Sequence, residues 1–143
     1  MSKSLIEQAK NKIANLVSDY DQVVMEGKLQ QFSEADVGSK YILTLVDALG
    51  WNIKNIDEVK EQRRTLVGPV DYSLNIDKKP RLVVEIKRFS ESLDTKRTVR
   101  GKEESYPEQA IGYAWHLKVD WVILSNFAET RLYYSMSQSH KMG

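Results

Sequence analysis

The chain has 143 residues, the size of one domain with one substantial core. Its 41% hydrophobic content and three tryptophans favour a folded protein, and its net charge of +1 excludes a bulk basicity that would by itself indicate nucleic-acid binding. Cysteine is absent, which excludes disulfides, zinc–thiolate sites and thiol nucleophiles. The first seven residues lack a signal-peptide core and no stretch is apolar enough to span a bilayer, so we expect a soluble cytoplasmic protein with no membrane partner.

Two helices are predicted before residue 51. Ser4 has the position of an N-cap for a helix over residues 4–26, which Gly27 would end. Ser33 has the position of an N-cap for a second helix, which Gly50 would end. The apolar stripe of the first helix consists of Leu5, Ile6, Ala9, Ile13, Leu16, Val17, Tyr20 and Val24. The core face of the second consists of Val37, Tyr41, Ile42, Leu45 and Leu49.

Glu34 falls on the apolar face of the second helix, one turn before Val37. A glutamate in a first turn ordinarily complements the helix dipole. The alternative is that Glu34 points inward, toward the charged residues of the strands that follow. The sequence leaves both interpretations open.

Two strands joined by a tight turn are predicted near the middle of the chain. Residues 51–66 are mixed and charged, and they predict a short strand with an irregular approach. Residues 67–76 alternate between polar and apolar side chains, as a strand does. Residues 77–80 favour a hairpin turn, so the apolar run at 81–88 is expected to pair antiparallel with the strand before it.

Charged side chains on this hairpin form the most informative pattern in the sequence. Side chains alternate between the two faces of a strand, so Glu85 and Lys87 project together. The opposite face of their strand carries Leu82, Val84 and Ile86. On the preceding strand, one face carries the polar residues Asp71, Ser73 and Asn75. The other face carries the apolar residues Val70, Tyr72, Leu74 and Ile76. Pairing in a hairpin would bring Asp71 and Glu85 close together.

The segment that follows the hairpin, residues 89–104, is polar and charged, and two interpretations stay open. The simpler one is a solvated loop. The other is a flap beside the hairpin, whose cations fold onto phosphate groups. These cations are Lys96, Arg97, Arg100 and Lys102.

The last third of the chain predicts a helix and two strands. Ser105 and Glu108 form a capping box that opens a helix ending near residue 117. Strands are expected over residues 120–125 and 131–134, because both contain short apolar and aromatic runs.

The order of these elements, α-α-β-β-β-α-β-β, predicts the fold class. A mixed central β-sheet flanked by helices, in the α/β class, is the natural architecture for it. We expect a single domain with an N-terminal helix at 1–31, a core at 32–134 and a flexible tail at 135–143.

Asp71, Glu85 and Lys87 together suit the hydrolysis of a phosphodiester bond. Two acids and an amine on a buried sheet are costly unless a cation compensates. Mg²⁺ would compensate, since it takes carboxylate oxygens, waters and substrate phosphate as ligands. Lys87 would orient the attacking water or hold the phosphate. The candidate metal ligands are Asp71 and Glu85, with the Ile86 carbonyl and Glu34 as additions.

The tripeptide that carries Glu85 and Lys87 is a weak signal by itself. An acid, any residue and a lysine occur five times in the chain, and Glu58-Val59-Lys60 is another copy. Only the copy at Glu85 ends an apolar strand that follows a second strand with an acid. An ion-paired surface hairpin, in which Lys87 and Asp71 neutralise each other, therefore stays open. The absence of a Gly-rich phosphate loop and of a Gly-x-Ser-x-Gly elbow excludes nucleoside triphosphatases and serine hydrolases.

These motifs resemble those of the PD-(D/E)XK nuclease superfamily. The matching residues are Pro69-Val70-Asp71 and Glu85-Ile86-Lys87. More narrowly, the chain is similar over residues 32–134 to the N-terminal nuclease domain of type I restriction-enzyme R subunits and to nuclease regions of type IIG enzymes. The further similarities are the acid that opens a helix ending Ala48-Leu49-Gly50-Trp51, Gln109 and Tyr113 four residues apart, and Leu124-Ser125-Asn126 before Arg131-Leu132-Tyr133.

The resemblance implies a restriction-endonuclease-like core and Mg²⁺-dependent cleavage of DNA, with Mn²⁺ able to replace Mg²⁺. For Gln109 and Tyr113, solvation and ordinary helix packing stay open as alternatives. The residues that the resemblance assigns to the nuclease centre are Asp71, Glu85, Lys87, Glu34, Gln109 and Tyr113.

The resemblance also implies partners, because the chain carries no helicase motor, methyltransferase or target-recognition region. Other domains or subunits would supply translocation, methylation and target recognition, and a transient homodimer would allow both DNA strands to be cut. DNA would be held with little sequence preference through phosphate contacts. The alternatives are a catalytically silent nucleic-acid-binding or assembly module and a nuclease of the repair or resolvase type. The candidate DNA-binding residues are Arg63, Arg64, Arg88, Lys96, Arg97, Arg100 and Lys102.

Overall fold

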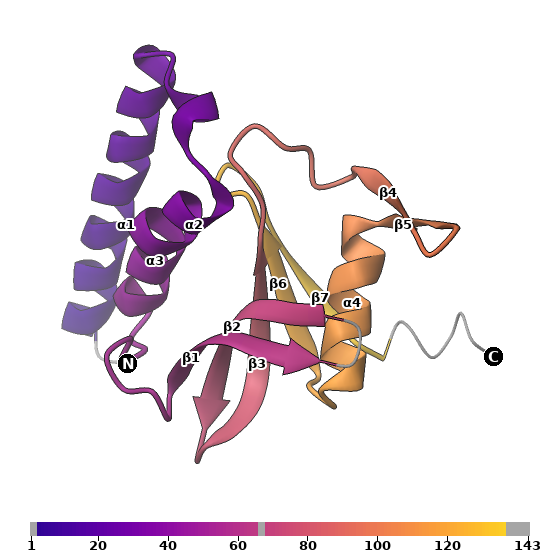
Figure 1. The fold of residues 1–143 in the computed structure, drawn as a ribbon. Helices are drawn as coiled ribbons and strands as arrows, with labels where there is room; N and C mark the ends of the chain where they lie inside the picture. The colour runs from indigo at the N-terminus through magenta and orange to yellow at the C-terminus, as the bar shows by residue number, and fades with distance from the viewer. Residues whose placement is uncertain (1–2, 66–67, 137–143) are drawn as a thin grey trace.

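The computed structural model describes residues 3–65 and 68–136 and contains a five-stranded sheet with helices on both faces (Figure 1). The strand order across the sheet is β1-β2-β3-β6-β7. β3 and β6 are parallel, and the other neighbouring strands are antiparallel. A mixed α/β protein with a mixed central sheet is therefore confirmed. The strands are β1 (Val59–Thr65), β2 (Gly68–Ile76), β3 (Lys79–Ile86), β6 (Trp121–Ser125) and β7 (Thr130–Tyr134).

Two apolar clusters, one on each face of the sheet, hold the helices. Val84 and Ile86 pack in the cluster formed with the N-terminal helices, whereas Val83 packs in the cluster formed with helix α4 (Tyr106–His116). The predicted alternation along β3 is thus confirmed. Along β2 it is wrong at one position, because Val70 packs with α4 although Tyr72 packs with the N-terminal helices. The pairing of β2 with β3 ends at Tyr72, so the strand is free to twist before that residue.

Helix α1 (Lys3–Met25) covers nearly the range of the predicted first helix, and Gly27 follows it with a φ of +68°. The predicted N-cap is wrong, because the helix already includes Lys3 and Ser4 lies within it. The predicted apolar stripe is buried only in part. Leu16 is buried and Tyr20 packs against the same cluster, and the main contact of α1 is with helix α3 (Leu43–Ala48). The apolar side chains of α1 that are between 41% and 49% exposed are Leu5, Ile6, Val17 and Val24.

The predicted second helix is present in three pieces. These are α2 (Glu34–Val37), a π-helical turn η2 (Gly38–Ile42) and α3 (Leu43–Ala48), and a 3-10 turn η1 (Leu29–Gln31) precedes them. The Ser33 Oγ atom accepts the Asp36 N–H at 3.1 Å, which confirms the predicted cap.

The π-helical turn changes which residues of the second helix face the core. Such a turn contains one extra residue, so the residues after it are rotated relative to a regular helix. Val46 and Ala48 are buried, whereas Leu49, which the sequence predicts on the core face, is 51% exposed. Gly50 follows with a φ of +105°, in agreement with its predicted role as the helix stop.

The central hairpin of β2 and β3 is antiparallel, as predicted. Its turn consists of Asp77 and Lys78, whose φ angles are +53° and +67°. Positive φ at both central residues is the geometry of a two-residue turn that matches the twist of a hairpin. Tyr72 pairs with Val84 across the ladder, so the acids next to them lie at the same level of the sheet.

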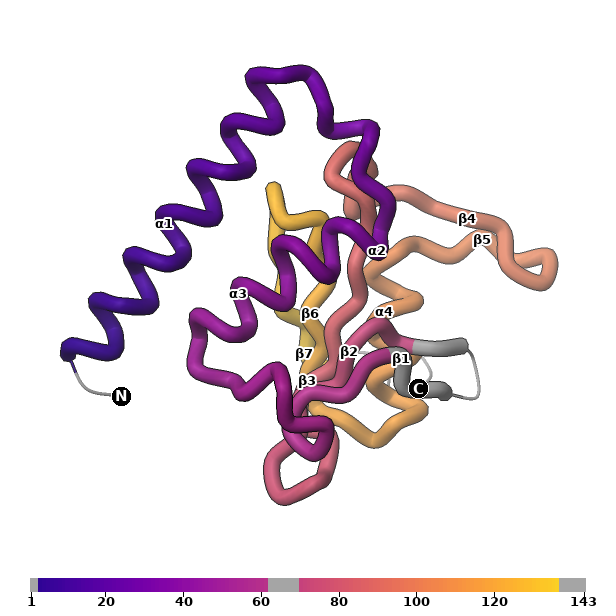
Figure 2. Tube along the Cα trace, turned by 60° about the vertical axis from the view of Figure 1, so that its left-hand side comes forward, coloured from indigo at the N-terminus to yellow at the C-terminus, as the bar shows by residue number. Residues whose placement is uncertain are grey.

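Strands flank the central hairpin of β2 and β3 in the chain. The short strand predicted within residues 51–66 is present as β1, which extends the sheet. Residues 89–104 are not one loop, because they contain an antiparallel hairpin of β4 (Lys96–Val99) and β5 (Lys102–Ser105). Phe89 and Leu93 are buried and anchor this segment, and the β4–β5 hairpin extends outward next to α4 (Figures 1 and 2).

The C-terminal part follows the prediction closely up to the tail. Ser105 Oγ accepts the Glu108 N–H at 3.2 Å, which confirms the cap of α4. The tail begins later than predicted, since Ser135 is buried and its N–H donates to the Asp120 carbonyl at 2.7 Å. Residues 137–143 lie outside the described residues. Among the helices that are described, none is both long and apolar enough to cross a membrane.

Gly38 lets the helix that carries Glu34 approach the sheet closely. A Cβ atom at position 38 would lie 3.1 Å from both the Tyr72 Oη and the Ile86 Cδ1 atoms. We expect Gly38→Val to lower the free energy of unfolding by about 1–3 kcal/mol, because extra carbon atoms in a packed interface force shifts. Gly112→Val in α4 is the matched control, since a Cβ there has no neighbour within 4 Å. Urea denaturation measures both, and equal losses would contradict the close approach.

Candidate functional site

The two acids of the central hairpin meet where β2 and β3 stop pairing. The ladder between the strands ends at Tyr72 and Val84. Just beyond it, Asp71 Oδ2 accepts a hydrogen bond from the Ile86 N–H at 2.7 Å, so a side chain replaces a backbone partner. The Asp71 and Glu85 carboxyl groups lie close enough for each to affect the pKa of the other. The structure therefore brings the two predicted acids together.

Lys87 lies beside this pair of acids and is also buried. Its Nζ atom is 3.8 Å from Glu85 Oε2, and Glu85 and Lys87 are only 7% and 8% exposed. The Lys87 N–H donates to the Ser125 carbonyl at 2.9 Å, so β6 fixes the backbone at the end of β3. The cluster is thus buried, unlike the surface ion pair that the sequence left open.

Burial raises the pKa of both acids, and the charge of Asp71 raises the pKa of Glu85 further. The pKa of Glu85 lies well above its ordinary range, first because burial removes water from the carboxylate and next because Asp71 is charged. Burial also raises the pKa of Asp71, while the Ile86 N–H and the Lys87 charge oppose this rise. In the absence of a further cation, these surroundings therefore favour the protonated form of Glu85.

Glu34 lies near enough to this cluster to sense its charges. It is the first residue of α2, directly after the Ser33 cap, and it is half-buried. Burial makes the largest contribution and raises the pKa of Glu34, the Lys87 charge lowers it, and the Asp71 charge raises it. The helix therefore carries a third acid toward the hairpin. Direct binding of a cation by Glu34 stays a prediction.

Helix α4 brings Tyr113 to the same cluster. Burial raises the pKa of the half-buried Tyr113, and the charges of Glu85, Glu104 and Asp71 raise it further. Gln109 lies one turn earlier on α4 and is also partly exposed. The two residues are thus on the helix that covers the acid side of β3, and their roles stay predictions.

Two residues that the sequence analysis did not select contact the cluster. The Lys87 Nζ atom lies 3.9 Å from the centroid of the Tyr106 ring, and the Tyr106 hydroxyl donates to Glu91 Oε2 at 2.5 Å. Tyr106 directly follows the predicted cap Ser105, and it is four residues before Ala110, which is fully buried. This spacing placed Tyr106 on the buried face of the helix. The sequence contained no signal that Lys87 would lie on its ring.

The predicted DNA-binding cations are distributed unevenly around the site. Arg88 is exposed directly after Lys87, and Arg97 lies 3.9 Å from Glu91. The structure gives Arg63 and Arg64 a place in β1, and their side chains lie outside what it describes. The exposed cations of the β4–β5 hairpin are Lys96, Arg97, Arg100 and Lys102.

Asp71 and Glu85 fit a divalent cation in chemistry and in charge. The two carboxyl groups, whose pKa values are raised, would gain a counter-charge from Mg²⁺, which binds proteins through one or two carboxylates and keeps several waters. In the described part of the chain, no group of three or more acidic or histidine side chains is arranged to hold a metal ion. The pair is therefore the core of the candidate site. The Ile86 carbonyl and Glu34 stay predicted additions.

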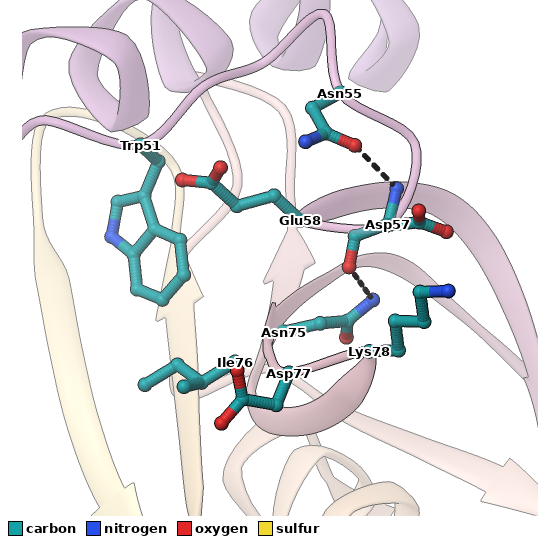
Figure 3. Close-up of a pocket in the computed structure, with 8 residues that line it drawn as sticks. All are labelled: Trp51, Asn55, Asp57, Glu58, Asn75, Ile76, Asp77 and Lys78. Carbon is teal, nitrogen blue, oxygen red and sulfur yellow. Dashed lines mark hydrogen bonds between the residues drawn. The ribbon is translucent and has the colours of Figure 1, made fainter.

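A separate hollow of about 350 Å³ lies at the other end of β2 (Figure 3). It is lined in part by Trp51 and by the hairpin turn at Asp77 and Lys78. Its amide groups already have partners, since Asn75 Nδ2 donates to the Asp57 carbonyl at 3.2 Å. None of the predicted site residues lines this hollow, so it is distinct from the acid–lysine cluster.

The raised pKa values predict that the metal-free protein loses stability as the pH rises. A carboxyl group with a higher pKa in the folded state binds more protons when folded. Its contribution to the free energy of unfolding is therefore complete below the unfolded pKa, about 4, and is lost as the pH rises through the folded pKa. In EDTA we expect the midpoint of thermal unfolding to fall as the pH rises from about 4 through the raised pKa of Glu85, and added Mg²⁺ to raise it again.

Glu85→Gln tests the source of this pH dependence. Removing the titrating group should make the free energy of unfolding decrease less steeply as the pH rises. For one proton, the slope of this decrease is at most about 1.4 kcal/mol per pH unit. Glu103→Gln, at an exposed position of β5, is the control and should retain the wild-type slope. Equal slopes in wild type and Glu85→Gln would show that Glu85 does not carry a raised pKa.

Comparison with protein-family models, curated proteins and solved structures finds no match for this chain.

Proposed function

We propose that the chain is a Mg²⁺-dependent DNA endonuclease domain of a restriction system, of the PD-(D/E)XK type. The observation that supports this best is the enclosure of Asp71 and Glu85 close together, with the Lys87 ammonium 3.8 Å from Glu85. Burying such a cluster costs free energy unless a cation compensates its charge, and a bound cation could take part in phosphodiester hydrolysis. The order of the sequence motifs, from the acid of the second helix to the paired residues of α4, supports the same function.

In this proposal, Asp71 and Glu85 hold the metal ion. A bound Mg²⁺ would supply positive charge beside the scissile phosphate and activate a water molecule for attack. Glu85 would have to lose its proton to the solvent in order to hold the ion, because only the ionised carboxylate is a ligand. Lys87 would direct its ammonium group to a phosphate oxygen or to the attacking water.

Residues around this cluster complete the proposed nuclease centre. Glu34 would bind the ion through a water, since it senses the charges of Asp71 and Lys87 from α2. Tyr113, whose hydroxyl senses the charge of Glu85, would position DNA or Lys87 from α4, together with Gln109. The exposed cations of the β4–β5 hairpin and Arg88 would hold the DNA backbone without reading its sequence.

A single copy of the chain carries one such centre and would nick one strand. Cleavage of both strands would require a transient homodimer or repositioning on the DNA. Translocation, methylation and target recognition would come from other domains or subunits in the cytoplasm.

A second candidate is a nucleic-acid-binding or assembly module that does not cleave. It is favoured by the fact that both acids already have partners within the chain. Asp71 accepts the Ile86 N–H, and the Lys87 Nζ atom lies 3.8 Å from Glu85. A nuclease of the repair or resolvase type would use the same centre on a different DNA substrate.

Cleavage of supercoiled plasmid tests the proposed nuclease. Wild-type protein should nick the plasmid in Mg²⁺ or Mn²⁺, and EDTA should stop the reaction. We expect Asp71→Asn and Lys87→Ala each to slow nicking by about 10²-fold or more, as the loss of one group that stabilises developing charge does in other enzymes. Lys60→Ala is the matched control, because Lys60 ends another acid-x-lysine tripeptide at an exposed position of β1. Nicking that persists in Lys87→Ala would contradict the assigned role of Lys87.

Calorimetric titration with Mg²⁺ separates the nuclease from the silent module. The wild-type protein should bind the ion, and Asp71→Ala should bind it at least about tenfold more weakly, since a carboxylate ligand is lost. Absence of binding by the folded wild-type protein would favour the silent module, even if partner subunits were needed for cleavage.

Salt dependence tests the DNA-binding surface. The slope of log affinity against log salt should decrease by about 0.9 for each phosphate contact that is removed from duplex DNA. Lys96→Ala, Arg100→Ala and Lys102→Ala should each reduce this slope, whereas Lys12→Ala on the exposed side of α1 should not. Fluorescence anisotropy with a labelled duplex measures the slopes, and four equal values would exclude the hairpin from the DNA interface.

A further inference from the structure

The Lys87 ammonium is held between a carboxylate and an aromatic ring. Its Nζ atom is 3.8 Å from Glu85 Oε2 and 3.9 Å from the centroid of the Tyr106 ring. Tyr106 is 1% exposed, so this contact is shielded from water. A cation over the face of an aromatic ring is attracted by the quadrupole of the ring, and the attraction is stronger where water is excluded.

The Tyr106 ring is itself fixed from two sides. Its hydroxyl donates to Glu91 Oε2 at 2.5 Å, and its backbone N–H donates to the Thr95 carbonyl at 3.1 Å. Burial, followed by the interaction with Glu91, raises the pKa of Tyr106 to about 12, so the hydroxyl keeps the proton that it donates. Arg97 of β4 lies 3.9 Å from the same Glu91 carboxylate. The ring is therefore a rigid surface beneath Lys87.

A rigid surface matters because a lysine side chain has many rotamers. Glu85 alone would restrain the ammonium group at one distance and leave it free to move around the carboxylate. The Tyr106 ring occupies a second side of the ammonium group, so the N–H bonds that contact neither Glu85 nor the ring can point in fewer directions. Restricting a reacting group in this way lowers the entropy that must be lost when it meets the substrate.

We propose that Tyr106 is a positioning residue that holds the Lys87 ammonium beside Glu85, in the orientation in which Lys87 meets the phosphate. The catalytic part of this inference rests on the proposed nuclease function. Tyr106 is not expected to touch the substrate, because it is almost fully buried and acts through Lys87. The ring, and not the hydroxyl, is the part of Tyr106 that contacts the lysine.

Substitutions that separate the ring from the hydroxyl test this assignment. Tyr106→Phe keeps the ring and should retain kcat within about threefold, whereas Tyr106→Leu removes it and should lower kcat about tenfold with an unchanged Kd for DNA. Tyr133→Leu is the matched control, because Tyr133 packs in the same apolar cluster as Tyr106. It should lower the thermal unfolding midpoint as Tyr106→Leu does, and it should leave kcat unchanged.

The position of the lysine can also be measured without catalysis. In protein labelled with ¹³C-lysine, the Lys87 ε-methylene protons should resonate upfield, because the adjacent aromatic ring shields them. The peak is identified by its loss in Lys87→Arg. It should stay upfield in Tyr106→Phe and return to the free-lysine position in Tyr106→Leu. A free-lysine position in the wild-type protein would overturn the proposal.

The outcomes distinguish this inference from the proposed function. If the wild-type protein nicks DNA, Lys87→Ala does not, and folded Tyr106→Leu matches wild type, Tyr106 is not a positioning residue and the nuclease stands. If Tyr106→Leu and Tyr133→Leu slow nicking equally, the effect is one of packing and the proposal is overturned. If the wild-type protein neither binds Mg²⁺ nor nicks DNA, the nuclease is rejected together with the catalytic part, and the methylene resonance alone decides whether Tyr106 holds Lys87.

Discussion

The enclosure of two acids beside one lysine, with Glu85 buried and Asp71 partly buried, is the constraint on which the arrangement of this chain depends. Asp71 and Glu85 would repel each other if both were ionised, and burial strengthens that repulsion. The surrounding structure offsets it with the Ile86 N–H and with the Lys87 ammonium. Each of these compensations is partial, and together they leave a site that gains from a divalent cation.

The sheet and both helical layers contribute to this site. The β2–β3 turn sets the level at which the acids meet, and β6 fixes Lys87 through the Ser125 carbonyl. Helix α2 carries Glu34 toward the acids from the N-terminal side, and α4 supplies Tyr106 and Tyr113 from the opposite part of the chain. The acidic cluster therefore depends on contacts between residues far apart in sequence, although its two acids belong to one hairpin.

The parts of the fold that depend on local sequence were the predictable ones. The caps at Ser33 and Ser105, the hairpin turn and the shared face of Glu85 with Lys87 follow from short-range chemistry, and all are present. The π-helical turn that exposes Leu49 was not predictable, because tertiary packing selects it. The β4–β5 hairpin escaped prediction, since its short strands lack apolar alternation. The contact of Lys87 with Tyr106 was not predictable, because it joins the end of β3 to α4 and the β4–β5 hairpin separates these two elements in the sequence.

The two-residue turn at Asp77 and Lys78 has a consequence for the order in which the chain folds. Short loops close at a lower entropic cost than long ones, so the hairpin is expected to form before strands that are distant in sequence pair. Asp71 and Glu85 therefore meet early, whereas Ser125 reaches Lys87 only after the β4–β5 hairpin and α4 have been placed. In the interval, the hairpin holds two like charges without the full set of contacts that later offset them. Proton or cation uptake by the acids would thus assist the folding of the chain as well as its final stability.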